Sequence, residues 1–293
     1  MMQSSTGGTD DAGSPGLQAL LRSVDATLAG ILSGDFPVDP ILGREVSHLV
    51  SKAASLQKRH GHLLEAGIVT ALRASHRFEV LTSVAVPITS AADSVVASTP
   101  PETLERISLR YDGPTARSVN LDFIVVDTEA GWAGAYDCKR GNGALTQRLL
   151  RPLVRDLECV GVLLRSFLRD RGYSTIDRVT VGLVDVYGAS GVPEHLALNL
   201  DHLDAHFGVA ITPILGAMNV RLEEGFRKAV PELLAPMRKV AAQDAAAALA
   251  SAMTDAVGEA RPEVGRTPAR FSGPGASDRS GRAVPGRRAG LAN

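Results

Sequence analysis

Asp122, Asp137 and Lys139 carry the strongest chemical signal in the sequence, because the second acid is separated from the lysine by a single residue. Carboxylates suit Mg²⁺, a hard cation that takes one or two of them and keeps water and substrate phosphate oxygens as its remaining ligands. A lysine beside such an ion can orient or help to deprotonate an attacking water and offset charge developing on a phosphate. Lys139 also forms the only Asp/Glu-x-Lys triplet in a chain with five lysines. The three residues therefore indicate metal-assisted hydrolysis.

A β-hairpin is predicted around these residues. Val119–Val126 is rich in β-branched and apolar residues, Thr128–Gly131 supplies a turn, and Trp132–Lys139 is a second extended run. Side chains two apart on a strand share a face, so the second acid and the lysine point the same way at a spacing of about 6.6 Å. Antiparallel pairing across the turn brings the first acid close to both. The hairpin would thus assemble two acids and one lysine.

These residues resemble the signature of the PD-(D/E)XK superfamily of restriction-endonuclease-like nucleases, which is an acid, a variable gap, and then acid-x-Lys on the next strand. Asp122, Asp137 and Lys139 occupy those positions here, although Leu121 stands where the family commonly has proline. The triplet begins with Asp rather than the commoner Glu. The family also commonly places a glutamate in the helix before the first strand, and Glu65 fits that place.

The resemblance covers about Leu63 to Tyr187. It implies an α/β fold with an αβββαβ core, in which helices flank a mixed central sheet, and extra N- and C-terminal helices. It also implies a Mg²⁺-dependent endonuclease that hydrolyses phosphodiester bonds, with DNA favoured over RNA and Mn²⁺ as a substitute ion. Asp122, Asp137 and Glu65 would hold the metal, and Lys139 would position the water and stabilise the developing charge.

A long helix predicted over Leu145–Arg169 would lie beside this site, because the Gly-Asn-Gly at 141–143 makes a sharp turn into it. Free backbone N–H groups at its start could hold a phosphate. Gln147 resembles the catalytic glutamine of nuclease groups with a Gln-x-x-x-Tyr motif, although the position four later is Arg151. Arginines recur on one side of the helix, while leucines and valines supply its buried side. The residues expected to contact the nucleic-acid backbone are Arg140, Arg148, Arg151 and Arg155.

The remaining pattern predicts the elements that frame the site. Leu64, Ile68 and Leu72 form one apolar stripe on a helix, and Glu65 lies beside that stripe, where a side chain could reach into a cleft. The polar segment Thr89–Arg117 is expected to be a long loop. The other expected elements are a disordered leader over 1–16, a helix over Leu17–Leu32, a helix from Asp39 to Ser75 with a break near Gly61, and strands over Phe78–Ile88 and Ile176–Tyr187.

The C-terminal part is expected to be helical from Asn199 to about Ala256, with breaks at Pro213, Pro231 and Pro236. From Glu259 onward seven arginines accompany three acids, which is typical of a disordered basic tail that adds nonspecific attraction to phosphate. The expected domains after the leader are a nuclease-like domain over 17–225, an Ala-rich helical extension over 226–258 and the tail over 259–293. The extension could brace the core or join two copies into a homodimer.

Composition narrows the class of protein. The net charge of −1 gives no global attraction to nucleic acid, so such binding must come from local patches. The chain has two cysteines, whereas superfamily members with an iron–sulfur cluster use four, so we expect no cluster and no disulfide framework. The start of the chain lacks the basic and apolar regions of a signal peptide, and no apolar run is long enough to span a bilayer. We therefore expect a cytoplasmic protein without a membrane partner.

Other interpretations stay open beside the nuclease. Asp137 and Lys139 could form a surface ion pair in a non-catalytic nucleic-acid- or protein-binding module that keeps the nuclease fold. The Ala-rich region could instead make the chain a helical assembly protein. His202 and His206 lie four apart and could ligate zinc from one helical face, although no glutamate follows His202 as a metalloprotease helix requires. The sequence lacks the fingerprints of dinucleotide-binding, phosphate-loop and serine-hydrolase proteins.

Overall fold

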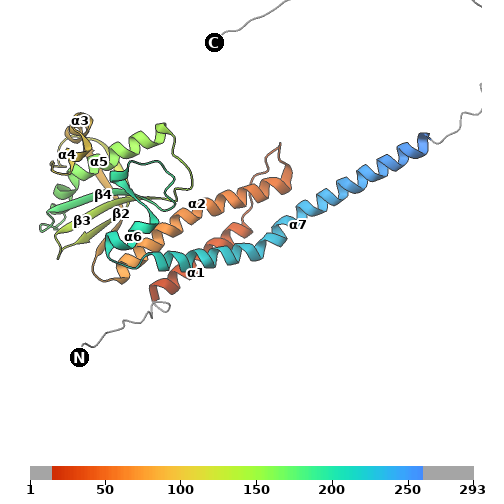
Figure 1. Ribbon diagram of the computed structural model, residues 1–293, viewed down its shortest axis with the longest axis horizontal. Helices are drawn as coiled ribbons and strands as arrows, with labels where there is room; N and C mark the ends of the chain where they lie inside the picture. Colours follow the sequence, from red (N-terminus) through yellow and green to blue (C-terminus); the bar gives the residue numbers. More distant parts are fainter. Residues whose placement is uncertain (1–14, 260–293) are drawn as a thin grey trace, which may run out of the picture. The chain divides into compact units, whose positions relative to one another are not determined.

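In the computed structural model, which describes residues 15–259, a five-stranded sheet lies between helices on both faces (Figure 1). The elements are, in order, α1 (Pro15–Ser33), α2 (Gly43–Ala74), β1 (Glu79–Thr89), α3 (Ser90–Ser98), α4 (Pro101–Leu104), β2 (Thr115–Asp127), β3 (Trp132–Lys139), α5 (Gln147–Arg169), β4 (Arg178–Asp185), the short 3₁₀ helix η2 (Glu194–Leu196), β5 (Ala197–Leu198), α6 (Leu200–Phe207) and α7 (Thr212–Glu259). The predicted α/β class with a mixed, helix-flanked sheet is therefore confirmed.

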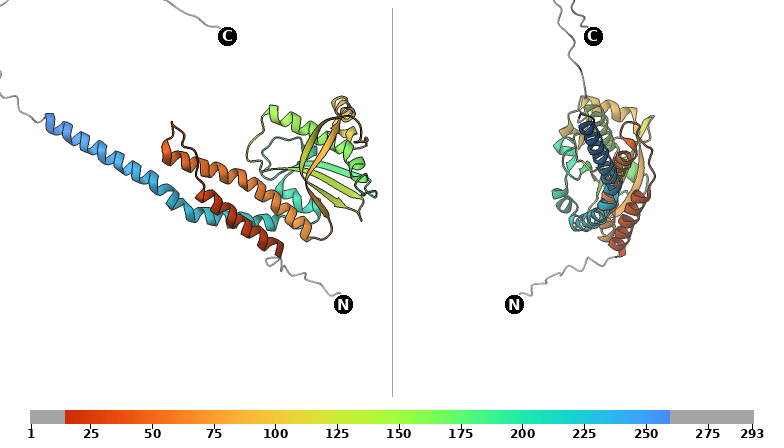
Figure 2. Two further views of the ribbon diagram at one scale, coloured as in Figure 1. Left: turned by 180° about the vertical axis from the view of Figure 1, so that it is seen from behind. Right: turned by 90° about the vertical axis from the view of Figure 1, so that its right-hand side faces the viewer.

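The strands lie in sequence order across the sheet. β1 and β2 are antiparallel, as are β2 and β3, whereas β3, β4 and β5 are parallel. The predicted hairpin is confirmed, because β2 and β3 pair from Asp127↔Trp132 to Phe123↔Tyr136 around the turn at 128–131. The parallel step from β3 to β4 is made through α5, which covers one face of the sheet (Figure 2).

Two apolar cores lie on opposite faces of the sheet. The first is built from α1, α2, α6 and the start of α7, on the face that carries Phe123 and Tyr136. The second is built from α3, α4 and α5, on the face that carries Ile124 and Ala135. Alternate residues of a strand point to opposite faces, so the hairpin is held from both sides. The end of the hairpin, where the acids and the lysine lie, is therefore well supported.

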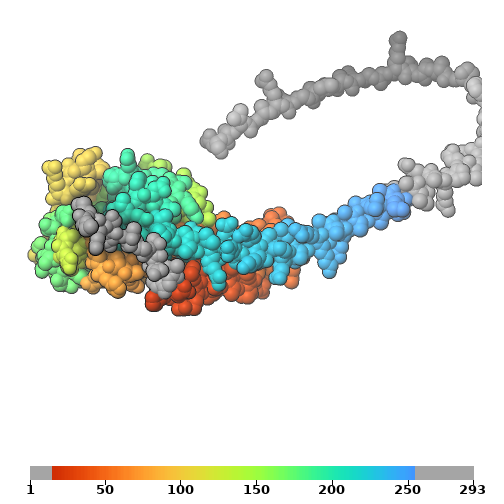
Figure 3. Space-filling model, turned by 60° about the horizontal axis from the view of Figure 1, so that its bottom comes forward, coloured from red at the N-terminus to blue at the C-terminus, as the bar shows by residue number. Residues whose placement is uncertain are grey.

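The first part of α7 lies beside α1 (Figure 3). Arg221 donates two hydrogen bonds of 2.8 Å to the carboxylate of Asp25. Gly225 lets Leu28 approach, because a Cβ at this glycine would lie only 2.4 Å from Leu28 Cδ2. These contacts attach the beginning of the long helix to the domain that carries the sheet.

α2 is one continuous helix, so the predicted break near Gly61 is wrong. A glycine inside a helix costs only about 1 kcal/mol relative to alanine. The following turns bury Leu64 and Ile68 completely, and that burial outweighs the cost of the glycine. The helix begins at Gly43 rather than near Asp39, whose side chain instead caps the turn before it.

The segment Thr89–Arg117 contains α3 and α4 and the start of β2, so its prediction as a long loop is wrong. Thr89 caps α3, since its Oγ1 accepts a hydrogen bond of 3.2 Å from the Ala92 N–H. Ala92 and Val96 then bury one side of the helix against the second core. Two buried residues in a helix this short leave too little periodicity to reveal it in a polar stretch.

α7 continues through Pro231 and Pro236, so the predicted breaks at these prolines are wrong. Each internal proline costs about 3 kcal/mol, but the residues around them are mainly Ala, Leu, Glu, Lys and Arg, which favour helix. Pro213 is the second residue of α7, where a proline removes no helical hydrogen bond. The predicted break at Pro213 is confirmed, because α6 ends at Phe207 and α7 begins at Thr212.

The chain divides into two compact units, Met1–Val240 and Ala241–Asn293, and the division falls inside α7. The domain boundary expected between 225 and 226 stays a prediction. Pro15 and Gly16 already belong to α1, so the end of the expected leader is helical. The rest of that leader and tail residues 260–293 lie outside the described residues. None of the helices within residues 15–259 is long and apolar enough to cross a membrane.

Candidate active site

Asp122 lies where β2 departs from regular pairing with both neighbouring strands. The ladder between β2 and β3 ends at Phe123↔Tyr136, and the ladder between β1 and β2 passes over Asp122. The residue opposite it on β1 is Ser83, which has a φ of 54°. Asp122 Oδ2 accepts a hydrogen bond of 2.6 Å from the Cys138 N–H of β3. The irregular backbone thus directs this carboxylate toward β3.

Asp137 and Lys139 share one face of β3 and contact each other, as the strand spacing predicts. Lys139 Nζ donates a hydrogen bond of 2.7 Å to Asp137 Oδ1. The side chain of Asp137 is 14% exposed and that of Lys139 is 44% exposed. The pair therefore shelters the carboxyl group and presents the ammonium group to solvent, where a substrate could meet it.

The pKa of the Asp137 carboxyl group is raised to about 6. Burial is the main cause, and Asp122 adds to it through a hydrogen bond between the two carboxyl groups and through like-charge repulsion. Lys139 opposes the rise in this pKa without cancelling it. The two acids are therefore held closer together than their charges favour, and a bound cation would relieve that repulsion.

Glu65 approaches the same site from α2. The apolar stripe predicted for this helix is fully buried, and Glu65 lies at its edge with a side chain that is 27% exposed. The pKa of Glu65 is raised, mainly by burial. The charge of Asp137 also raises this pKa, whereas His62 and Lys139 lower it. The Glu65 carboxyl group is therefore influenced by the charges of Asp137 and Lys139, while its part in holding a metal stays a prediction.

Cys138 stands between the acid and the lysine in the sequence but is poorly suited to act as a nucleophile. Its side chain packs against the first core, on the face of β3 opposite to its two neighbours. Burial raises the pKa of this thiol, and the charges of Asp122, Glu65 and Asp137 raise it further. The thiol therefore stays protonated at neutral pH. The chemistry of this site belongs to the carboxylates and the lysine.

Asp122 and Asp137 together offer two carboxylates to one hard cation. Mg²⁺ commonly uses one or two carboxylates and completes its shell with water and substrate oxygens. Within residues 15–259, no group of three or more His, Cys, Asp or Glu side chains is placed to hold a metal ion. Metal binding by Asp122, Asp137 and Glu65 therefore stays a prediction.

Gln147 is the first residue of α5, and its side chain is exposed. It lines an open cavity of about 360 Å³ together with Arg151 and Arg155. No hydrogen bond within the described part of the chain joins Gln147 to the carboxylates of the hairpin, so its part in catalysis stays a prediction. Arg148 and Arg151 are exposed and make no ion pair with any described carboxylate. They stay available to a phosphate backbone.

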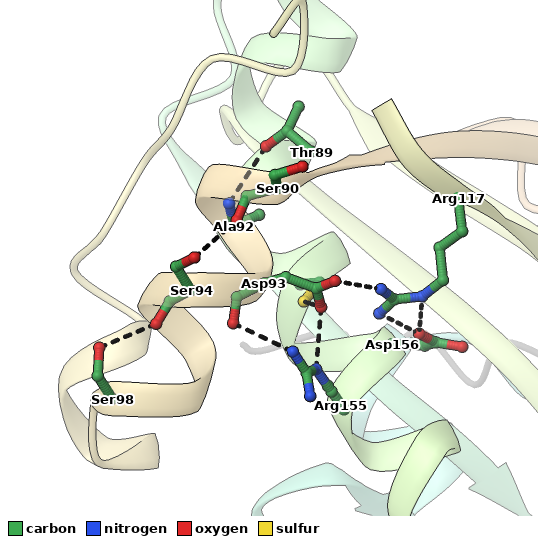
Figure 4. A network of polar contacts seen from close by, with 10 residues as sticks. Thr89, Ser90, Ala92, Asp93, Ser94, Ser98, Arg117, Arg155 and Asp156 are labelled. Atoms are coloured by element: carbon green, nitrogen blue, oxygen red, sulfur yellow. Dashed lines mark hydrogen bonds and ion pairs between the residues drawn. The ribbon is translucent and has the colours of Figure 1, made fainter. Parts of the chain in front are cut away.

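Arg155 belongs to an ion-pair network that joins α3, β2 and α5 (Figure 4). Its Nε donates a hydrogen bond of 2.9 Å to Asp93 Oδ1. Arg117 Nη1 donates to Asp93 Oδ2 at 2.5 Å, and Arg117 also donates two hydrogen bonds of 2.8 and 2.6 Å to Asp156 Oδ1. The hydrogen bond from Arg117 is the largest influence on the pKa of Asp93 and lowers it. Arg155 would have to leave Asp93 before it could reach a phosphate.

His206 lies at the edge of the first core, where its side chain stays partly exposed and contacts a buried tyrosine. Its Nε2 lies 2.6 Å from the hydroxyl group of Tyr136, which is almost fully buried. Burial lowers the pKa of His206, so the neutral ring is favoured. His202 is exposed on the same helix, and neither histidine belongs to a metal-binding group in residues 15–259. The zinc interpretation therefore gains no support.

A cavity of about 640 Å³ lies away from the carboxylates, beside α4, α5 and the first residues of β4. Its lining includes Trp132, Glu158, Arg165 and His195 but none of the residues that converge at the hairpin. The candidate site is instead defined by the buried carboxyl group of Asp137, which contacts Lys139 and lies beside a second acid, and whose pKa is raised as at many functional sites.

Three side chains thus meet at the end of the hairpin, namely Asp122 on β2, and Asp137 and Lys139 on β3, while Glu65 on α2 is near enough for the charges of Asp137 and Lys139 to act on its pKa. Comparison with protein-family models, with curated proteins and with solved structures finds no match to this chain. The assignment of the site therefore rests on residue types, geometry and electrostatics.

Proposed function

We propose that this protein is a Mg²⁺-dependent nuclease of the restriction-endonuclease-like type, which hydrolyses phosphodiester bonds in DNA. The observation that carries the proposal is the convergence of Asp122, Asp137 and Lys139 at the end of the β2–β3 ladder. An acid whose pKa is raised by burial and by a second acid is typical of a catalytic or metal-binding site. A purely structural ion pair would favour the ionised acid.

The order of elements supports the same proposal. α2, β1, β2, β3, α5 and β4 follow one another as helix, three strands, helix and strand, with α3 and α4 inserted between β1 and β2. An antiparallel hairpin is followed by a parallel strand beyond a crossover helix. This order supports the core that the resemblance implies, through an observation that is independent of the acidic motif.

Each residue has a role that its position allows. Asp122 and Asp137 would hold the metal through their carboxylate oxygens, with Glu65 contributing from α2. When bound, Mg²⁺ supplies Lewis-acid polarisation of a phosphoryl oxygen and lowers the pKa of a coordinated water. The partly exposed ammonium group of Lys139 would orient the attacking water and stabilise negative charge on the phosphate.

Cleavage assays with a matched pair of lysine variants test the proposal. Wild type, Lys139→Ala and Lys58→Ala are incubated with supercoiled plasmid and with single-stranded DNA, in Mg²⁺, in Mn²⁺ and in EDTA. Lys58 is an exposed residue of α2 and is the control for loss of one positive charge. We expect wild type and Lys58→Ala to cut only with metal, and Lys139→Ala to be at least about 100-fold slower. Equal cutting by both variants would contradict the assigned role of Lys139.

A non-catalytic binding module with the same fold is the second candidate, because the acids of the site already have partners within the protein. Lys139 contacts Asp137, and Asp122 accepts the N–H of Cys138. Such a module would bind DNA equally well as wild type and as Lys139→Ala, and calorimetry would detect only weak Mg²⁺ binding. Absence of cutting together with these two results would favour the binding module.

A further inference from the structure

Arg140 and Tyr187 lie directly beyond the proposed catalytic lysine. Arg140 follows Lys139 at the end of β3, and the Tyr187 N–H donates a hydrogen bond of 3.1 Å to its carbonyl oxygen. The N–H of Val186 donates a second hydrogen bond of 3.2 Å to the carbonyl oxygen of Lys139. The segments that follow β3 and β4 are therefore joined, and both side chains have a defined position relative to the lysine.

The guanidinium group of Arg140 is partly buried and has no ion-pair partner in the described part of the chain. Its Nε and Nη1 atoms are buried and have no hydrogen-bond partner in the described structure. Within residues 15–259, no carboxylate forms an ion pair with it. His60 lies nearby, but its pKa is lowered by burial, and Arg140 lowers it as well. An unpaired cation with buried donors is costly, and a bound anion would offset that cost.

Tyr187 supplies an aromatic surface beside this cation. The Cζ atom of Arg140 lies 5.6 Å from the centroid of the Tyr187 ring. The ring of His60 is 6.3 Å away at an interplanar angle of 45°, and His60 Nε2 is itself held at 2.8 Å from Asn219 Oδ1. Tyr187 nevertheless stays 47% exposed. The ring is supported from within the protein and open toward solvent.

We propose that Arg140 and Tyr187 form a subsite for an unpaired nucleotide, in which Arg140 binds a phosphate and Tyr187 stacks on the base. A guanidinium group that lacks a counter-anion, next to an exposed aromatic ring, matches the two chemical parts of a nucleotide. The inference rests on the proposed nuclease function, because Lys139 would act on the adjoining phosphate. A base can stack on a side chain only after it leaves its neighbours in a duplex. The subsite therefore selects single-stranded DNA, or an unpaired end, over continuous duplex.

Binding measured in EDTA tests the subsite without any cleavage. Fluorescence anisotropy is recorded with a single-stranded oligonucleotide, the same strand with abasic positions, and the matching duplex. We expect wild type to bind the single strand more tightly than the duplex. Tyr187→Leu should weaken binding of the intact strand about tenfold and change binding of the abasic strand less than about twofold. Tyr187→Phe, which keeps the ring, should bind like wild type.

The contribution of Arg140 is tested against a second arginine variant. Arg140→Gln should weaken binding of both strands, because the phosphate is common to them. Arg169→Gln removes an exposed arginine at the last residue of α5 and should have little effect. Wild type that prefers duplex, or Tyr187→Leu that weakens both strands equally, would overturn the subsite.

The two proposals can fail separately in these experiments. Base-dependent binding that is lost in Tyr187→Leu, without any cutting by wild type, would keep the subsite and remove the nuclease. Cutting that depends on Lys139, with binding unchanged in both Tyr187→Leu and Arg140→Gln, would keep the nuclease and remove the subsite.

Discussion

Two clusters of acids and bases in the sheet-bearing domain have opposite electrostatic character. In the network between α3, β2 and α5, Arg117 and Arg155 both donate to Asp93, and the pKa of this acid is lowered. At the end of the hairpin, Asp137 has one contact to Lys139 and a second acid beside it, and its pKa is raised. The first cluster favours the ionised form of Asp93, whereas the second disfavours the ionised form of Asp137.

The contrast indicates what each cluster contributes. Charges that are fully paired inside a protein stabilise the folded state only through their partners, and loss of one partner leaves a buried charge. Where burial and a neighbouring acid disfavour ionisation of an acid, the ionised group lowers the stability of the metal-free protein. Such a loss of stability is common where residues are arranged for function. Substitutions in the two clusters should therefore change stability in opposite directions.

The largest change in stability is expected from Arg117→Met in the paired network. Loss of this guanidinium leaves Asp93 and Asp156 with unmatched charge, so the free energy of unfolding should fall by about 2–3 kcal/mol, less than for a fully buried pair because the network is partly exposed. Urea denaturation measures the change. Arg178→Met removes an exposed ion pair to Asp177 and should change this free energy by less than about 0.5 kcal/mol. Similar losses in both variants would contradict the special role of the network.

The free energy of unfolding should rise, rather than fall, in Asp137→Asn without metal. Because the folded-state pKa is raised from the ordinary 3.8 to about 6, ionisation of Asp137 reduces stability progressively from about pH 4 to about pH 6 and by a constant amount above. The variant should therefore be more stable than wild type by about 1–2 kcal/mol at pH 7. The gain should vanish below about pH 4. Urea titrations across this pH range measure it.

Asp93→Asn sharpens that test because the pKa of Asp93 is lowered in the folded state. Its ionised form contributes stability above the ordinary pKa of 3.8, and this contribution is lost as the pH falls through the lowered value. Asp93→Asn should therefore destabilise the protein at pH 7. A loss of stability in Asp137→Asn at pH 7 would show that both clusters are structural.

A smaller effect on activity is expected for Glu65→Gln. Glu65 shares the electrostatic environment of the site but makes no direct hydrogen bond with the hairpin acids among the described residues. We expect cleavage to be about tenfold slower at saturating DNA, with a higher Mg²⁺ concentration required for half the maximal rate. Ala66→Ser, at the exposed neighbouring position, is the control. An unchanged Mg²⁺ requirement would mean that Glu65 is only a solvated residue of α2.

The centre of the site could be predicted because its signals are local. The β-branched run over Val119–Val126 and the turn over Thr128–Gly131 define the hairpin. Strand alternation then places Asp137 and Lys139 on one face, which the structure confirms. The continuity of α2 could not be predicted from Gly61, because the burial that overrides a glycine depends on residues from other elements.

The roles of Arg155 and Tyr187 depend on distant partners. Arg155 contacts Asp93, which lies 62 positions away in the sequence. The regular spacing of arginines on α5 could not distinguish this structural residue from candidates for phosphate contact. Tyr187 meets Arg140 only because β3 and β4 pair in parallel, and no local pattern specifies that pairing. In both cases, contacts between distant parts of the chain decide whether an arginine is ion-paired, as Arg155 is, or available to a ligand, as proposed for Arg140.

The most direct test of the central claim is the rate of DNA cleavage by wild type and by Asp137→Ala in Mg²⁺, with the fold of each checked by circular dichroism and thermal melting. We expect a folded variant whose cleavage is reduced by at least about 1,000-fold, because a carboxylate proposed to hold the metal is gone. Cleavage by folded Asp137→Ala at the wild-type rate would contradict the central claim.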